Sequence, residues 1–356
     1  MASPPRVSVL DQSPVPEGSS GPDALGNTVD LAQLTESLGY ERYWLAEHHA
    51  TPMLACTSPE VVIAAVAAQT ARIRVGSGGV MLPHYSPLKV AECFSVLTGL
   101  NPGRIDLGIG RAPGTDPQTM FALQRDRRLA APDDFPEQLA ELLAYLEDGF
   151  PAGHPLARLT ALPGLPEAPE VWLLGSSRQS AIWAAELGLP YSFADFINPG
   201  GAEHTRLYRE RFVPSQRAPE PHVAVAVSTI CAETDEEADR LAASLRMAIT
   251  LLHRGQLVQV PTVERAERWL AGQGLPNAMP PGRRAVVGSP TTVRAGLEEV
   301  ATEYGADELQ IVTITHDHAA RRRSYELVAD VFGLTVSWDE KPGAANEPPI
   351  ARRAFG

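Results

Sequence analysis

The stretch Tyr43-Trp44-Leu45-Ala46-Glu47-His48-His49 is a short apolar run that stops at an acid and two histidines. An apolar run of this length, without polar alternation, is typical of a strand that is buried on both faces. Such a strand would deliver three titratable groups together at its carboxyl end. Taken alone, the segment fits an exposed loop with solvated side chains equally well. The rest of the chain favours the strand, because the same pattern recurs along it.

Eight apolar segments are followed by small, polar or charged residues, and helical patterns follow most of them. Apolar strands that alternate with helices predict a parallel (β/α)8 TIM barrel, whose ligand site lies at the carboxyl ends of the strands. We expect one domain over residues 1–336, with an insertion between strands seven and eight, where residues 254–284 show no clear pattern. The predicted strands lie at residues 7–10, 43–46, 73–75, 105–107, 171–174, 191–194, 223–230 and 309–314.

Composition narrows the possible functions. The 356 residues are 44% hydrophobic and carry a net charge of −13 without a basic run, which disfavours nucleic acid or an anionic membrane as a partner. No secretory leader or membrane-spanning stretch is recognised, so we expect a cytoplasmic protein. Three scattered cysteines form no CxxC motif, which argues against a disulfide framework and a structural zinc site. The tail, residues 337–356, shows no periodicity and is expected to be mobile.

One segment indicates an anion site. Gly175, Ser176 and Ser177 end the fifth predicted strand, and Ser180 lies in the first turn of the helix that follows. The start of a helix offers unpaired N–H donors and a partial positive charge. Serine capping alone is the commoner explanation of an isolated Gly-Ser-Ser. Arg111, at the end of the neighbouring fourth strand, favours a bound phosphate.

Two further motifs lie at predicted strand ends. Gly78 and Gly79 follow Ser77 and remove two side chains at the mouth of the barrel, so a flat ligand could lie against the backbone. A bulge or turn explains the glycine pair without any ligand. His316 and His318 face the same way if the chain is extended there. No further set of ligands accompanies them, so we predict no metal site and regard both as candidates for a substrate pocket, as is His49.

The segments WLAEHH, VGSGGVMLP, GRIDLGIGR, VWLLGSS and DELQIVTITHDHAARRRSYEL, taken in this order, resemble the bacterial luciferase-like flavin-dependent monooxygenases. The similarity runs from Arg6 to Leu334 and is strongest to the single-chain subgroup with GSGGVMLP and THDHA signatures. It implies a TIM barrel that uses reduced FMN from a separate flavin reductase, together with O2, to oxygenate a small organic substrate. Related barrels imply two alternatives: an F420-dependent oxidoreductase that transfers hydride, and a flavin-binding protein without catalysis.

The resemblance also implies roles for individual residues. His48 corresponds to the catalytic histidine of the family, with Glu47 as the acid beside it, and we expect the pKa of His48 to lie near neutrality. Gly110 stands where luciferase has a reactive cysteine, so light emission is not implied. A non-prolyl cis peptide is expected at Gly78-Gly79. The residues expected to bind the cofactor are Ser77, Gly78, Gly79, Arg111, Gly175, Ser176, Ser177 and Ser180.

The helix predicted from Val61 to Ala71 is rich in Val, Ile and Ala almost all the way round. Such a helix must be covered on more than one side. Together with the helix from Leu88 to Leu97, it is the surface on which we expect a two-fold homodimer. The alternative is that both helices only cover the barrel.

Overall fold

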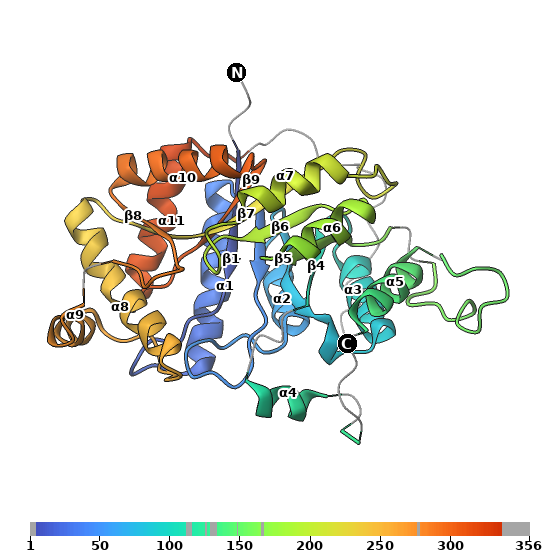
Figure 1. Ribbon diagram of the computed structural model, residues 1–356, viewed down its shortest axis with the longest axis horizontal. Helices are drawn as coiled ribbons and strands as arrows, with labels where there is room; N and C mark the ends of the chain where they lie inside the picture. The colour runs from blue at the N-terminus through green and yellow to red at the C-terminus, as the bar shows by residue number, and fades with distance from the viewer. Residues whose placement is uncertain are drawn as a thin grey trace, which may run out of the picture.

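The computed structural model describes residues 5–111, 116–124, 127–128, 134–147, 149–164, 167–275 and 278–336. In these ranges all strands join one parallel sheet in the order β6-β5-β4-β3-β2-β1-β9-β7-β8, and a pairing of β6 with β7 closes eight of them into a ring. The predicted (β/α)8 barrel is therefore confirmed (Figure 1). The strands are β1 (Arg6–Asp11), β2 (Arg42–Leu45), β3 (Arg74–Met81), β4 (Ile105–Gly110), β5 (Glu170–Gly175), β6 (Tyr191–Ala194), β7 (Val223–Cys231), β8 (Ala285–Gly288) and β9 (Glu308–Val312).

Helices surround this ring, and most begin at a recognisable capping signal. Ser20, for example, accepts a hydrogen bond from the backbone of Asp23 at the start of α1, and Gly39 ends that helix with a φ of 88°. The helices are α1 (Gly21–Leu38), α2 (Pro59–Gln69), the short 3-10 turn η1 (Leu82–His84), α3 (Pro87–Leu100), α4 (Pro117–Leu123), α5 (Phe135–Leu146), α6 (Arg178–Glu186), α7 (Ala202–Arg211), α8 (Asp235–His253), α9 (Val263–Gly272), α10 (Pro290–Tyr304) and α11 (His318–Phe332). None of these described helices is long and apolar enough to cross a membrane.

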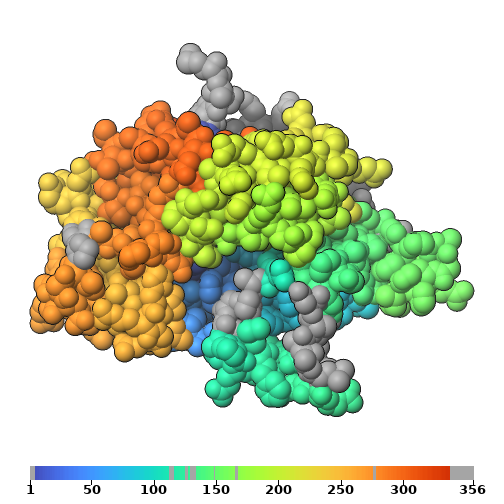
Figure 2. All heavy atoms as spheres, in the orientation of Figure 1, coloured from blue at the N-terminus to red at the C-terminus, as the bar shows by residue number. Residues whose placement is uncertain are grey.

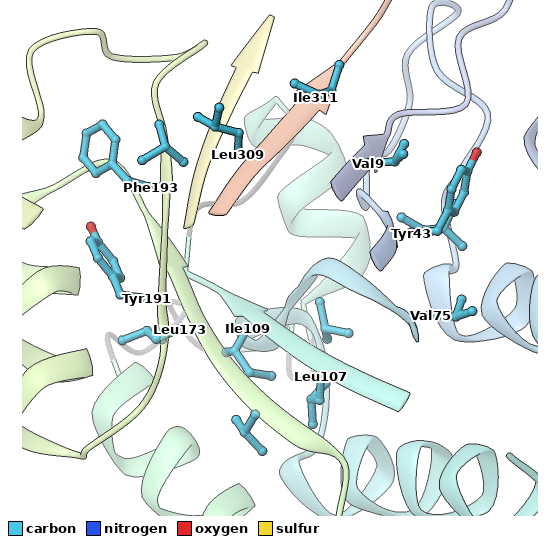
Figure 3. Packing of buried hydrophobic residues seen from close by; sticks show 14 of the residues in the cluster. Val9, Tyr43, Val75, Leu107, Ile109, Leu173, Tyr191, Phe193, Leu309 and Ile311 are labelled. Carbon is cyan, nitrogen blue, oxygen red and sulfur yellow. The ribbon is translucent and has the colours of Figure 1, made fainter. Parts of the chain in front are cut away.

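The core has two layers because successive residues of a strand point to opposite faces. Val9 and Tyr43 belong to the large cluster between strands and helices, part of which Figure 3 shows. Their neighbours Leu10 and Trp44 belong to a smaller cluster inside the ring. There Trp44 meets Trp172 edge to face, with ring centroids 5.2 Å apart. The interior of the barrel is thus filled with side chains.

Buried ion pairs close the amino-terminal end of the barrel. Arg42 Nη1 lies 2.8 Å from Asp106 Oδ2, and Arg42 Nε lies 3.3 Å from Glu308 Oε2. Arg42 also reaches Glu170, at 3.3 Å. The arginine holds the pKa of Glu308 at about 2 against the opposing effect of burial. These charged groups pair with one another and fill the amino-terminal end of the barrel. The carboxyl ends of the strands therefore form its open end.

The insertion contains elements that the sequence pattern did not predict. Helix α9 lies within residues 254–284, and β8 begins at Ala285, directly after that stretch. β8 pairs with Ser228–Cys231, the last part of β7, and lies outside the closed ring. The eighth strand of the ring is therefore β9, at the predicted position. Helices α4 and α7 were also not predicted.

Candidate active site

Two neighbouring cavities lie at the carboxyl ends of the strands. The first, here the glycine–serine cavity, has a volume of about 480 Å³. The second, here the apolar cavity, has a volume of about 510 Å³ and is lined by Met53, Leu54, Leu245, Ile249, Met279 and Ile314 among others. Figure 2 shows a hollow between the segments of α8, α7 and α4, with blue amino-terminal residues at its bottom. Both cavities are lined by Gln12, His48, Phe196 and Ile197, so His48 lies where they adjoin.

The backbone of Gly78 and Gly79 forms one wall of the glycine–serine cavity. The peptide bond between them is cis, as expected. A Cβ atom on Gly78 would lie 2.3 Å from Leu10 Cδ1, and one on Gly79 would lie 2.7 Å from the carbonyl oxygen of Gly108. The pairing of β3 with β4 shifts register between Gly78 and Val80. This wall is therefore bare backbone, and the backbone of Gly108 behind Gly79 leaves no room for a side chain at that position.

The start of α6 forms the other end of the same cavity. Ser177 is the N-cap, and its hydroxyl accepts a hydrogen bond from Ser180 N at 3.3 Å. Ser180 Oγ donates to the Ser177 carbonyl at 2.8 Å and lies 3.0 Å from the hydroxyl of Tyr191. The guanidinium of Arg111 lies 5.5 Å from the ring centroid of Trp183, on α6. The structure thus brings Gly175, Ser176, Ser177, Ser180 and Arg111 to one cavity, as the sequence predicted.

Ser77 is the exception among the predicted cofactor-binding residues. Its side chain is buried, and its hydroxyl donates to the carbonyl of Gly108 at 2.9 Å. Ser77 is not among the described residues that line either cavity. The geometry gives it a role in holding β3 against β4.

Glu47 and His48 do not form the expected pair. Glu47 is fully buried, and Oε1 lies 2.6 Å from His49 Nε2 and 3.0 Å from the hydroxyl of Tyr85. Its second oxygen accepts a hydrogen bond from the backbone N–H of Met81 at 2.9 Å. The acid therefore ties the end of β2 to the end of β3 through Met81, and it also holds His49 and Tyr85.

His48 lies on the cavity side, and its ring is deep in the barrel mouth. Burial lowers its pKa to about 4; the adjacent His49 acts in the same direction, and a hydrogen bond with the Ala46 backbone opposes both. The expectation of a pKa near neutrality is therefore wrong, because desolvation outweighs the stabilising partner. Nδ1 of this ring is buried and has no hydrogen-bond partner among the described residues. At pH 7 the imidazole is neutral and can accept or donate one hydrogen bond there.

Of the other three histidines considered from the sequence, His49 lies at a cavity, whereas His316 and His318 lie away from both cavities. His49 lines the apolar cavity. His316 Nε2 lies 3.1 Å from the carbonyl of Glu17, and His318 Nε2 lies 2.8 Å from Asp30. Neither is among the described residues that line the two cavities, which does not support their role as pocket residues. The described part of the chain contains no group of three or more His, Cys, Asp or Glu side chains arranged to hold a metal ion.

Comparison with known proteins agrees with this geometry. A family model of the luciferase-like monooxygenases matches residues 6–308. The chain belongs to this family. It is 47% identical to the uncharacterised protein YwcH of Bacillus subtilis (strain 168), over 92% of this chain and 98% of YwcH. It is 39% identical to the N-acetyl-S-alkylcysteine monooxygenase of the same organism, over 91% of this chain and 97% of that enzyme.

Solved structures also resemble this luciferase-like monooxygenase. The crystal structure of apo-MsnO8 is 43% identical, with a TM-score of 0.84, and the match covers 93% of this chain and 98% of that one. A type II Baeyer–Villiger monooxygenase in complex with FMN is 22% identical, with a TM-score of 0.69, and the match covers 92% of this chain and 97% of that one. An F420-dependent secondary alcohol dehydrogenase is 14% identical, with a TM-score of 0.60, and the match covers 92% of this chain and 99% of that one. At these identities the last two likenesses establish the fold alone.

Several residues of this luciferase-like site were not predicted from the sequence. Gln12 and Phe196 line both cavities, and Trp183 lines the glycine–serine cavity. Gln12 directly follows β1, so the rule that strand ends carry the site was sufficient to find it. Trp183 lies three residues after Ser180 on α6, which is the spacing of one helix face. Phe196 lies two residues beyond β6, in a turn that no sequence pattern marked.

Proposed function

We propose that this luciferase-like monooxygenase binds FMN in the glycine–serine cavity. One observation carries the proposal: a single cavity combines the bare backbone of Gly78 and Gly79 with the start of α6 and the side chain of Arg111. The flat ring system would lie against the glycine wall, where a Cβ atom on Gly79 would meet the backbone of Gly108. The phosphate would be held by Arg111 and the hydroxyl and N–H groups of Ser176, Ser177 and Ser180. The residues present fit this group.

Bound reduced flavin supplies the electrons with which O2 is activated. The protein would bind the substrate in the apolar cavity, beside the flavin, since His48, Gln12 and Phe196 line both cavities. The bound substrate would exclude water from the site. His48 is neutral at pH 7, and its unpartnered Nδ1 would hold or pass one proton between cofactor and substrate. A separate flavin reductase in the cytoplasm would supply the reduced cofactor.

We propose a small organic substrate with an alkyl portion, because most of the described residues that line the apolar cavity are apolar. The N-acetyl-S-alkylcysteines, for which a relative with 39% identity is named, are the first class to test.

We also propose that the enzyme is a homodimer. Val61, on α2, has 65% of its surface exposed, and Leu100, at the end of α3, has 73% exposed. Ala64, Ala65 and Ala68 are exposed on the same helix as Val61. Small side chains allow close approach of helices, and a two-fold axis would place the same apolar face on both partners.

FMN binding and turnover test the proposal together. The purified protein is titrated with FMN and, in parallel, with F420, and binding is followed by calorimetry. Oxygen uptake is then measured with NADH, a flavin reductase and N-acetyl-S-butylcysteine. We expect micromolar or tighter FMN binding, weaker F420 binding and oxygen uptake that depends on the substrate. Preference for F420 would instead indicate a hydride-transferring enzyme, and FMN binding without turnover on any thioether or ketone would indicate a binding protein.

A further inference from the structure

Arg283 places a positive charge on the wall of the apolar cavity. It is the one arginine or lysine among the described residues that line this cavity. Nη1 donates to the carbonyl of Phe196 at 3.0 Å, and Nε lies 3.3 Å from Nε2 of His253. These two bonds fix the guanidinium between α8 and the turn after β6.

The charge of Arg283 has no counter-ion in the described part of the chain. No carboxylate there lies within ion-pair distance of Arg283, whereas the adjacent Arg284 pairs with Asp195 and Glu303. Nη2 of Arg283 has no hydrogen-bond partner among the same residues, in contrast to Nη1 and Nε. Burial alone lowers the pKa of Arg283, and an arginine remains protonated in spite of it. A partly buried cation without an anion is costly unless a ligand supplies one.

The surrounding wall is apolar along one side. Leu245, Ala248, Ile249 and Leu252 lie on α8 at intervals of three and four residues and form one stripe that faces the cavity. The acid among the described residues on the wall is Asp116. Its Oδ1 accepts hydrogen bonds from Gln118 N at 2.9 Å and Thr119 N at 3.1 Å, and its Oδ2 accepts one from the Thr119 hydroxyl at 2.6 Å. That carboxylate is therefore committed to the start of α4.

We propose that the apolar cavity binds a small organic acid whose carboxylate pairs with Arg283 and whose alkyl portion lies along the α8 stripe. This arrangement would leave the far end of the molecule toward His48, where the two cavities adjoin. The planar guanidinium suits a carboxylate because two parallel N–H groups can meet its two oxygens. The inference rests on the proposed function, since it specifies the substrate of that monooxygenase.

The test compares acids with their methyl esters in direct binding, without turnover. The probes are butanoate, hexanoate, octanoate and N-acetyl-S-butylcysteine, each paired with its methyl ester, and binding is measured by calorimetry with and without oxidised FMN. We expect the wild type to bind at least one acid ten times more tightly than its ester. Arg283→Met should abolish that preference and leave the affinity for the ester within twofold. Arg283→Lys, which keeps the charge but loses the fork, should retain an intermediate preference.

Arg294→Gln is the matched control, because it removes an exposed arginine that pairs with Glu298 on α10. It should behave as the wild type does. Equal affinity for acid and ester in the wild type, absence of binding by every acid, or an acid preference that survives in Arg283→Met would each overturn the inference. FMN titrations of the same proteins separate the two proposals: loss of the acid preference with FMN binding intact concerns Arg283, whereas a wild type that binds acids but not FMN contradicts the proposed function alone.

Discussion

Glu47 Oε1 lies 2.6 Å from Nε2 of His49, whereas no hydrogen bond joins Glu47 to His48 in the described part of the chain. The two adjacent imidazoles consequently have different surroundings. His49 is held by a buried carboxylate, and His48 is left with an unpartnered Nδ1 beside both cavities. Glu47 is thus a positioning residue at the junction of β2 and β3, and His48 is the one of the two that is placed for chemistry.

Replacement of Glu47 by Gln should lower the free energy of unfolding by about 2–4 kcal/mol, because a buried charged acceptor with three donors around it is lost. Tyr85→Phe removes only one of these hydrogen bonds and should cost about 1 kcal/mol. Urea unfolding of both variants provides the measurement. An unfolding midpoint for Glu47→Gln equal to that of the wild type, combined with lost activity, would assign the acid to catalysis instead.

The lowered pKa of His48 should make the stability of the folded protein depend on pH. Its pKa is about 4 in the folded protein against an ordinary value of 6.5, so between these values the unfolded chain binds a proton that the folded protein does not. The free energy of unfolding should therefore fall as the pH falls from 6.5 to 4, by at most about 3 kcal/mol from this residue. His48→Gln should flatten the decline while FMN binding is retained and turnover is lost. Parallel pH profiles of wild type and variant would show that this pKa is not depressed.

The sequence predicted the ring of strands because each contains a short, mainly apolar segment that ends in small, polar or charged residues. It did not predict β8, since Ala285–Gly288 directly follows the stretch 254–284, which shows no clear pattern. The pairing within the Glu47-His48-His49 cluster could have been predicted, because alternate residues of an extended chain share a face. Arg283 could not, because it belongs to an irregular segment that reaches the cavity only through the insertion.

Arg111 should contribute strongly to FMN affinity. Replacement by Ala removes a charged partner of the phosphate, which should cost about 1.5–3 kcal/mol, or roughly ten- to hundredfold in Kd. Arg178→Ala is the control, since Arg178 is also at the start of α6 but points to Glu203, 3.8 Å away, and does not line the cavity. Fluorescence titration with FMN gives both constants. Equal losses in the two variants would indicate a general effect of charge rather than a contact with the phosphate.

Gly108 should be intolerant of any side chain, although it does not line either cavity. A Cβ atom there would lie 2.1 Å from the carbonyl oxygen of Ser77, which is backbone and cannot rotate away. Gly108→Ala should therefore lower the free energy of unfolding by about 3 kcal/mol or more. Gly26→Ala is the matched control, because Gly26 lies on α1 with nothing within 4 Å of its Cβ position. It should stabilise the protein by about 0.5–1 kcal/mol. Comparable unfolding midpoints for the two variants would contradict the close approach of β3 and β4.

The exposed face of α2 should carry the dimer. Val61→Asp places a charge on a side chain with 65% of its surface exposed, where a partner helix would have to desolvate it. We expect light scattering at micromolar concentration to show a monomer. A thermal unfolding curve should show that the midpoint of the barrel itself is unchanged. Val213→Asp introduces the same change at a residue with 53% of its surface exposed, beyond the end of α7, and should leave the dimer intact. If the wild type is already monomeric, or if Val61→Asp remains dimeric, the apolar residues of α2 and α3 only cover the barrel.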